Sequence, residues 1–430
     1  MPLLRPRRAR AAAAAALALV AAACSDDDPV SPGPRPGAER SAAEFRRLLV
    51  ADDAQPFARL YDLGSGQRVD SIGGLPGPVT YLYSAQGRVA AMHFQTRNRV
   101  QFLDGGVYLQ NDRGVRAAAR LLGGVSDSVP LHGNHSGDIL TAWFDGSGVA
   151  RFWREGDLAA GNVTPMLTVN SGAPHHGAAV TLPGGQLVAL SAKSATGTGP
   201  DGVVVFDLQG RRVDSTRACP NLHGLTTSAA GAAYGCSDGV LLVSAQNGRG
   251  VFTKITRADD PRFGSGTVVG RAGAANLLAR LTVRGAEVTA ATRMLGVVDV
   301  AGRTLLPITA PGGDIDWVFD LDYSGRHALM LGRTGNLYVF DMGTRQLTGR
   351  LDGFVPPMPT TGTVPTPVFA SAEGLVYVSN PTRGEVVEVA LTAAGVPTVA
   401  RRLPVGGTPT RLVVLGVRRG GTVVAADQSP

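Results

Sequence analysis

Histidine is the residue type in this sequence whose placement suggests chemistry. The chain has seven histidines, and five of them fall between positions 132 and 223. They lie in three short segments, residues 131–138, 173–177 and 219–224. Neutral imidazole binds Zn²⁺ at about 2.0–2.1 Å, and three or four such ligands make a zinc site. The clustering predicts a metal site if the fold brings the three segments together.

The same histidines could instead end strands or hydrogen-bond to backbone carbonyls without binding any metal. That alternative suits a single histidine better than it suits three successive repeats that each carry one at the same place. A glycine follows His132, His176 and His223. A residue without a side chain allows the backbone to turn toward the centre of the fold without a clash.

Other residues that could do chemistry are less informative. His93 lies in an apolar strand, where we expect it to be packed or hydrogen-bonded, and His327 is predicted to be an exposed turn residue. The acidic residues between positions 314 and 322 could bind Ca²⁺, but no EF-type loop surrounds them. No nucleophile elbow, metalloprotease helix or phosphate-binding loop is expected. An enzyme is therefore the less expected class.

Cys219 and Cys236 are candidates for a disulfide. They stand 17 positions apart near the ends of candidate strands, a separation that a β-hairpin or two neighbouring strands can close. Such a pair oxidises in an exported protein, and closing a loop of this size contributes about 3 kcal/mol. The alternative is a thiolate metal site, which would need more Cys or His at short spacing.

The first residues predict export. Residues 1–10 are cationic, residues 11–23 carry no polar side chain, and Cys24 follows three alanines. This pattern predicts a lipoprotein signal peptide at residues 1–23, lipidation of Cys24 and a flexible tether at residues 24–46. The alternative is an ordinary signal peptide followed by an unrelated cysteine. We expect the mature protein on the periplasmic or cell-surface face of a bacterial membrane, held by its lipid anchor.

Regularly spaced strands predict the fold. Eight similar strand segments occur at residues 58–66, 99–104, 149–153, 203–207, 240–243, 297–300, 337–341 and 385–389. Their spacing matches a four-stranded propeller blade of about 40–50 residues. The 57 glycines and 28 prolines favour many turns over long helices. We predict an all-β chain with one β-propeller at residues 47–418, of seven or eight blades with eight favoured, and a flexible tail at residues 419–430.

The net charge of +7 does not indicate a nucleic-acid partner. Four arginines lie in the predicted signal peptide, and the others are scattered without interleaved aromatic residues. After Cys24, no stretch of the sequence is long and apolar enough to span a membrane. We expect a monomer that does not bind nucleic acid.

Several motifs resemble one known family. Residues 173–180, 219–224 and 234–240, with residues 137–148 as weaker support, look like the periplasmic zinc chaperones of the AztD type. The His-His-Gly and Cys-Pro-x-Leu-His-Gly motifs are the specific part of this similarity. The resemblance implies a β-propeller that hands zinc to the solute-binding protein of a zinc ABC importer.

The resemblance also implies particular roles for residues of this chain. It assigns His135, His176 and His223 to a central metal cluster, with His175 as a fourth candidate, and it pairs Cys219 with Cys236. This chain departs from the family in one feature that concerns the transfer of zinc. The family's histidine-rich mobile loop corresponds here to residues 106–114, which contain no histidine.

Two functions follow as hypotheses. The leading one is a membrane-anchored accessory protein of zinc import or homeostasis that binds Zn²⁺ and acts as a chaperone, store or sensor. The alternative is a metal-free β-propeller interaction scaffold on the cell surface. Neither is an enzyme.

Overall fold

The computed structural model describes residues 45–110, 113–197, 199–362 and 364–416. The predicted signal peptide, Cys24, all but the last two residues of the predicted tether, and the predicted tail lie outside these residues. Within them, the regular secondary structure is almost entirely β-strand, as the sequence predicts.

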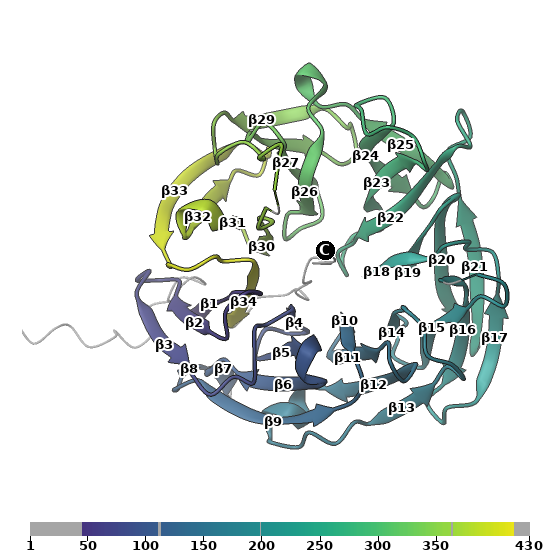
Figure 1. The fold of residues 1–430 in the computed structure, drawn as a ribbon, viewed down its shortest axis with the longest axis horizontal. Helices are drawn as coiled ribbons and strands as arrows, with labels where there is room; N and C mark the ends of the chain where they lie inside the picture. The colour runs from purple at the N-terminus through teal and green to yellow at the C-terminus, as the bar shows by residue number, and fades with distance from the viewer. Residues whose placement is uncertain (1–44, 111–112, 198, 363, 417–430) are drawn as a thin grey trace, which may run out of the picture. The chain divides into compact units, whose positions relative to one another are not determined.

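Eight four-stranded antiparallel sheets form a ring (Figure 1). Given from the innermost strand outward, the first four sheets are β4 (Tyr81–Ser84), β5 (Val89–Phe94), β6 (Arg99–Asp104) and β9 (Arg120–Ser126); β10 (Pro130–Ser136), β11 (Ile139–Phe144), β12 (Val149–Arg154) and β13 (Leu167–Asn170); β14 (Ala179–Thr181), β15 (Leu187–Lys193), β16 (Pro200–Asp207) and β17 (Arg212–Thr216); and β18 (His223–Ser228), β19 (Gly231–Cys236), β20 (Gly239–Gln246) and β21 (Arg249–Ile255).

The next four sheets complete the ring. They are β22 (Phe263–Val269), β23 (Leu277–Val283), β24 (Arg293–Asp299) and β25 (Thr304–Ile308); β26 (Asp316–Leu321), β27 (His327–Gly332), β28 (Leu337–Asp341) and β29 (Leu347–Leu351); β30 (Phe369–Ala372), β31 (Leu375–Asn380), β32 (Glu385–Leu391) and β33 (Pro397–Pro404); and β34 (Arg411–Gly416), β1 (Arg46–Ala51), β2 (Ala58–Asp62) and β3 (Arg68–Ile72).

The prediction of an eight-bladed β-propeller is confirmed. The eight repeated segments of the sequence coincide with β2, β6, β12, β16, β20, β24, β28 and β32, which is the third strand of every blade. The first of these segments belongs to a blade of its own, completed by the last strand of the chain. In that blade β34 pairs with β1 in a register that sets Gly416 opposite Arg46.

Large apolar side chains fill the space between neighbouring blades. Tyr83 and Phe102 of one blade pack with Leu140 and Trp153 of the next, and all four are almost completely buried. Burying a large aromatic side chain removes about 150–250 Å² from water, which stabilises the fold by about 4–6 kcal/mol before the entropy cost is subtracted. Because both faces of each sheet are covered, inner strands such as β5 are buried along their full length.

Few residues of the described part lie outside the blades. A hairpin of β7 (Val107–Gln110) and β8 (Arg113–Arg116) is inserted between β6 and β9. The α-helix α1 (Glu155–Ala159) follows β12, and short 3₁₀ turns are η2 (Gln95–Arg97), η3 (Pro311–Gly313) and η4 (Pro381–Arg383). No helix among the described residues is long and apolar enough to cross a membrane.

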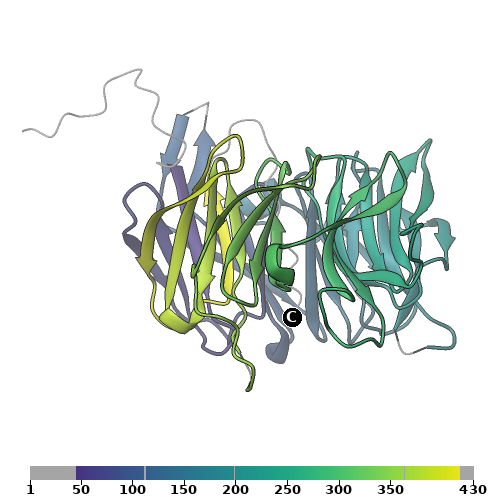
Figure 2. The same ribbon diagram turned by 90° about the horizontal axis from the view of Figure 1, so that it is seen from above.

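Figure 2 shows the ring turned by 90°, with the strands of neighbouring blades side by side. The innermost strands surround the central channel, and the residues that start them or stand just before them meet at one end of it. Side chains from different blades come together there, which is where the histidine segments of the sequence arrive.

Candidate metal centre

Three histidines from three successive blades meet at this end of the channel. His132 lies near the start of β10, His176 stands three residues before β14, and His223 is the first residue of β18. The ring centroids are 4.7 Å apart for His132 and His176, 5.3 Å for His176 and His223, and 6.1 Å for His132 and His223. The fold therefore brings together one histidine from each of the three segments singled out in the sequence.

Glycines next to these histidines are required by the close packing of the backbone. Gly224 has φ +70°, and a Cβ at this position would lie 2.7 Å from the carbonyl oxygen of Gly266 in the next blade. At Gly177 a Cβ would collide with Ser191 Oγ and would lie 2.9 Å from His175 Nε2. A larger residue at either position would displace the histidine beside it.

Hydrogen bonds fix the tautomers of two of the three rings. His176 Nδ1 lies 2.8 Å from Asp145 Oδ2, and His223 Nδ1 lies 2.8 Å from the carbonyl oxygen of Gly266. A carboxylate and a carbonyl can only accept, so each Nδ1 carries the proton and donates it. The Nε2 atom of each neutral ring then holds the electron pair that a metal ion would use.

Nε2 of His132 lies 3.3 Å from Nε2 of His176. Two nitrogens bound to one tetrahedral Zn²⁺ at about 2.0–2.1 Å are themselves about 3.3 Å apart, so this pair has the spacing of two ligands. Within residues 45–416, leaving out positions 111, 112, 198 and 363, no three His, Cys, Asp or Glu side chains have the arrangement of a complete metal site. His223, stacked against His176, would have to move closer to complete one.

The protonation of the two paired rings is set by different surroundings. Burial lowers the pKa of His132 to about 3, and a positive charge on the nearby His176 would lower this pKa further, so His132 is neutral at physiological pH. The hydrogen bond to Asp145 raises the pKa of His176 above its usual value, against the opposing effect of burial. A neutral donor thus stands beside a more basic one, and both imidazoles can bind a cation once His176 loses its proton.

His135, which the sequence resemblance assigns to the cluster, lies on the same strand as His132. Side chains alternate between the two faces of a strand, so His135 points to the face opposite to His132 and Asn134. His132 and Asn134 line a small cavity together with His176 and His223. The backbone carbonyl of His135 accepts a hydrogen bond of 3.2 Å from Thr227 Oγ1. Participation of His135 stays a prediction, and the geometry favours His132.

His175 has a bonding pattern that differs from that of its neighbour His176. Its Nδ1 lies 2.9 Å from the carbonyl oxygen of Ala173, and its Nε2 lies 3.2 Å from both the carbonyl oxygen and Oγ of Ser191. Burial lowers the pKa of this ring. With both nitrogens engaged, His175 anchors the segment that presents His176.

Asp145 is the residue of the site that sequence reasoning did not identify as functional. It lies in the turn after β11, where the sequence Asp-Gly-Ser-Gly has the form of an ordinary hairpin turn. Its Oδ2 accepts a hydrogen bond from Nδ1 of His176, whereas its Oδ1 is buried and has no hydrogen-bond partner among the described residues. The pairing of this turn with a histidine 31 residues later in the chain is a tertiary contact that no local pattern signals.

Two of the remaining expectations can be compared with the structure. His93 is completely buried, with its ring nitrogens 3.3 Å from the Pro130 carbonyl oxygen and 3.2 Å from the Tyr83 hydroxyl, so the prediction of a packed histidine is confirmed. The prediction of an exposed His327 is wrong. Its side chain is only 4% exposed and lies 3.3 Å from Asp322 Oδ2, because the turn around Gly395 of the next blade covers it.

All four residues of the acidic cluster around β26 have partners within the chain, and two of the four are paired with arginines. Asp314 accepts hydrogen bonds from hydroxyl groups, and Asp322 lies beside His327. Asp316 accepts from both Arg280 and Arg293, and Asp320 forms a buried ion pair of 2.9 Å with Arg271. Carboxylates that are already paired with guanidinium groups are poor ligands for Ca²⁺. The cluster therefore offers no free set of carboxylates for a calcium ion.

Residues 235–239 match the Gly-x-Ser-x-Gly sequence pattern of a nucleophile elbow. They span the end of β19 and the start of β20, which form a hairpin, whereas an elbow joins a strand to a helix. Ser237 Oγ lies 3.4 Å from Asn221 Nδ2. The segment serves as a turn between strands.

Cys219 and Cys236 form a disulfide, as predicted, with Cα atoms 4.9 Å apart. Both residues are completely buried. The bond ties the segment that leads into His223 to the end of β19.

We expect peptide mapping without reductant to recover the peptides of Cys219 and Cys236 as one linked species. Replacing both residues by serine should lower the free energy of unfolding by about 3 kcal/mol, because the unfolded chain regains the freedom of the open loop. Thermal unfolding with and without reductant measures this effect. Recovery of two separate alkylated peptides from the untreated protein would contradict it.

The fold and the site define an eight-bladed β-propeller with a cluster of three histidines at one end of its channel. A comparison with models of known protein families gives no match. The chain is 24% identical over 379 residues to the zinc chaperone AztD of Citrobacter koseri, and the aligned region covers 86% of each protein.

Solved structures agree with this similarity. The crystal structure of Citrobacter koseri AztD matches with a TM-score of 0.75 and 23% identity, over 87% of this chain and 98% of that one. The structure of apo AztD from the same organism matches with a TM-score of 0.71 and 22% identity, over 86% and 98%. The dihydro-heme d1 dehydrogenase NirN matches with a TM-score of 0.54 and 15% identity, over 95% and 86%, which shows how widely the propeller fold is shared. The resemblance to AztD expected from the motifs is confirmed.

Proposed function

We propose that this protein binds Zn²⁺ through His132, His176 and His223 and serves as an accessory protein of zinc handling. The observation that carries the proposal is the pair of Nδ1–H hydrogen bonds at His176 and His223, which leave Nε2 of each ring as the possible metal ligand beside a small cavity that both residues line. Three imidazoles, once His223 moves closer, match the ligand preference of Zn²⁺. The similarity to the zinc chaperone AztD supports the choice of metal.

Asp145 has a positioning role in this proposal. A carboxylate that accepts the Nδ1 proton of a ligating histidine orients the ring and makes its Nε2 a stronger donor. Asp145 lies 2.8 Å from His176 and is itself mostly buried, which strengthens its effect on the ring.

Exposure of one ligand favours binding that can be reversed. The side chain of His176 is 40% exposed, whereas His132 is almost completely buried. An incoming ligand from a partner protein can therefore approach zinc from the side of His176.

We propose that the partner is the solute-binding protein of a zinc ABC importer. The β7–β8 hairpin region carries no histidine to assist delivery, so holding or sensing zinc is the role that fits if no transfer is observed.

We expect the purified protein to bind one Zn²⁺ per chain and to lose affinity as the pH falls. His132 remains neutral down to about pH 3, so it contributes no proton competition in the physiological range. His176 must release a proton whose pKa Asp145 raises. Affinity should therefore fall as the pH decreases, by about tenfold per pH unit for each ligand proton that Zn²⁺ has to displace. Competition titration with a chromophoric chelator between pH 5 and pH 8 measures both quantities.

A stoichiometry of zero would contradict this proposal and favour the metal-free interaction scaffold. Binding whose strength does not change across that pH range would contradict imidazole ligation in particular. The proposal concerns binding, and no reaction is assigned to the protein.

We further propose that Cys24 is the mature N-terminus and is lipidated, which would hold the propeller at a membrane facing the periplasm or the cell exterior. Cys24 and the tether lie outside the described residues, so this proposal rests on the sequence. We expect the protein to partition into detergent and Cys24→Ser to remain unprocessed or to be released. Mass spectrometry of the mature terminus tests it, and an unmodified terminus after Ala23 would contradict it.

A further inference from the structure

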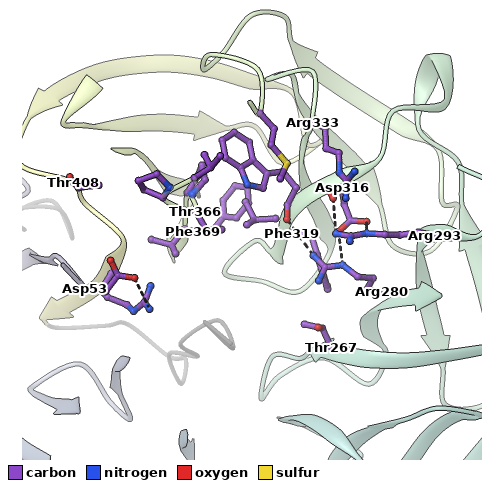
Figure 3. Close-up of a pocket in the computed structure, with 18 of the residues that line it drawn as sticks. Asp53, Thr267, Arg280, Arg293, Asp316, Phe319, Arg333, Thr366, Phe369 and Thr408 are labelled. Atoms are coloured by element: carbon purple, nitrogen blue, oxygen red, sulfur yellow. Dashed lines mark hydrogen bonds and ion pairs between the residues drawn. The ribbon is translucent and has the colours of Figure 1, made fainter. Parts of the chain in front are cut away.

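A second recess lies at the same end of the channel, formed by blades that do not contribute a histidine to the cluster. It is a cavity of about 530 Å³ bordered by the early residues of β26, β30 and β34 and by the loops that precede them. Figure 3 shows arginine side chains on its right side and apolar residues along its upper wall. Thr267 lines this cavity and is the neighbour of Gly266, which accepts the hydrogen bond of His223.

The cavity wall carries an excess of positive charge. Its residues include Arg280, Arg293, Arg333 and Arg411, but only two carboxylates, Asp53 and Asp316. Asp316 is fully buried and is shared by Arg280, at 2.6 Å, and Arg293, at 2.9 Å. Arg411 is paired with Asp53 at 3.2 Å.

Arg333 is the arginine of this wall that is not neutralised. Its guanidinium forms no hydrogen bond or ion pair with any residue of the described chain, and its Nε atom is buried without a partner. A buried donor that has lost its water and gained no acceptor costs about 1–3 kcal/mol. An anion placed in the cavity would supply the missing acceptor. Figure 3 shows Arg333 beside Asp316, on the same side of the cavity as Arg293.

Burial lowers the pKa of Arg280, against the attraction of Asp316, and the neighbouring Arg293 and Arg333 lower it further. The main cause is the loss of water around this guanidinium, which Asp316 does not fully compensate. An anion in the cavity would add a second partner for the charges on this side of the wall.

The rest of the wall is apolar. Trp317, Phe319, Met358 and Pro365 line it, and the Trp317 and Phe319 side chains are mostly buried. An apolar surface of this kind favours a ligand with an aromatic or aliphatic body over a small hydrated ion.

We propose that this cavity binds a small organic carboxylate with an apolar body, with its carboxylate held by Arg333 beside the Asp316 cluster and its body against Trp317 and Phe319. A planar guanidinium donates two parallel hydrogen bonds to a carboxylate, which gives the charged end of the ligand a fixed orientation. The site is separate from the histidine cluster and does not depend on zinc binding.

The test uses phenylacetate, its neutral counterpart phenethyl alcohol, and inorganic phosphate as probes of the purified protein by isothermal titration calorimetry. For a ligand of this size we expect phenylacetate to bind with a Kd of about 1 mM or tighter. Phenethyl alcohol and phosphate should each bind at least about tenfold more weakly, because one lacks the charge and the other lacks the apolar body.

Arg333→Gln is the informative variant because Asp316 keeps both of its arginines, so the fold is retained. We expect it to weaken phenylacetate binding at least about tenfold, and Arg333→Lys to give an intermediate loss because charge is kept without the planar fork. Arg211→Gln, on an exposed turn of another blade, is the matched control and should leave binding unchanged.

Absence of phenylacetate binding at about 10 mM, or equal binding by parent and Arg333→Gln proteins, would overturn the proposal. Tighter binding of phosphate than of phenylacetate would overturn the assignment of an apolar carboxylate. Zinc affinity of Arg333→Gln should equal that of the parent, so failure of this site and failure of the zinc site can be told apart.

Discussion

Replacing His176 or His223 by alanine is expected to lower the affinity for Zn²⁺ at least about 100-fold. Substitution of residues that only support a ligand already costs about 10–100-fold in metal affinity, so removal of a ligand itself should cost at least the upper end of that range. His132→Ala should have a similar effect, because its Nε2 lies at ligand spacing from His176. Competition with a chromophoric chelator at pH 8 measures the loss.

Two further variants make this test specific. His135→Ala removes a histidine from the same strand but from its opposite face, and we expect a change of less than about threefold. Asp145→Asn keeps the shape of the side chain but removes its charge, and it should weaken binding by about tenfold. A large loss in His135→Ala with none in His132→Ala would reverse the assignment of these two residues. Circular dichroism of each variant establishes that the propeller remains folded.

Glu155→Ala is expected to destabilise the propeller by about 3 kcal/mol or more. The carboxylate of this buried residue at the start of α1 accepts hydrogen bonds from backbone N–H groups in the β4–β5 turn of the preceding blade. The bonds from Arg88 and Val89 are both 2.6 Å long, and Gln86 donates a third. Truncation leaves these donors without an acceptor, at a cost of about 1–3 kcal/mol for each buried group.

Calorimetric unfolding measures this change, and at about 2.1 cal/mol/K per residue a loss of 3 kcal/mol lowers the Tm by about 4 °C. Asp157→Ala is the matched control, because Asp157 is an exposed acidic residue in the same helix. Equal Tm values for Glu155→Ala and the control would show that the contact between blades does not contribute to stability.

Repetition made the fold predictable from the sequence. One strand of each blade is short, largely apolar and bounded by turns, so its recurrence predicted the all-β class and favoured eight blades over seven. The disulfide was predictable because two cysteines of an exported chain have few other partners. The fold of the described residues and their disulfide could therefore be predicted from sequence patterns that are local or periodic.

The details of the metal centre depend on features that are not periodic. The pairing of β10 with β11 shifts register between Pro130 and His132, and a shift of one residue exchanges the faces of a strand. No residue in this segment signals that irregularity, and the expectation of His135 came from the family resemblance, which does not show which face of β10 points to the centre. The role of Asp145 and the burial of His327 depend on contacts with segments that are distant in the sequence. Such contacts cannot be predicted from local sequence patterns.

Closure of the ring has a consequence for the order of events during folding. The blade that contains β1 lacks its innermost strand until β34 arrives, and β34 is the last strand of the described residues. A growing polypeptide that does not yet include β34 cannot complete this blade, so the ring closes only after the strands of the other seven blades are present. A product cut short before β34 would expose the free edge of β1, and an unpaired edge is a template for aggregation. Proteases and chaperones would therefore encounter chains that lack β34 as open rings, whereas in chains that contain β34 this edge becomes paired when folding is complete.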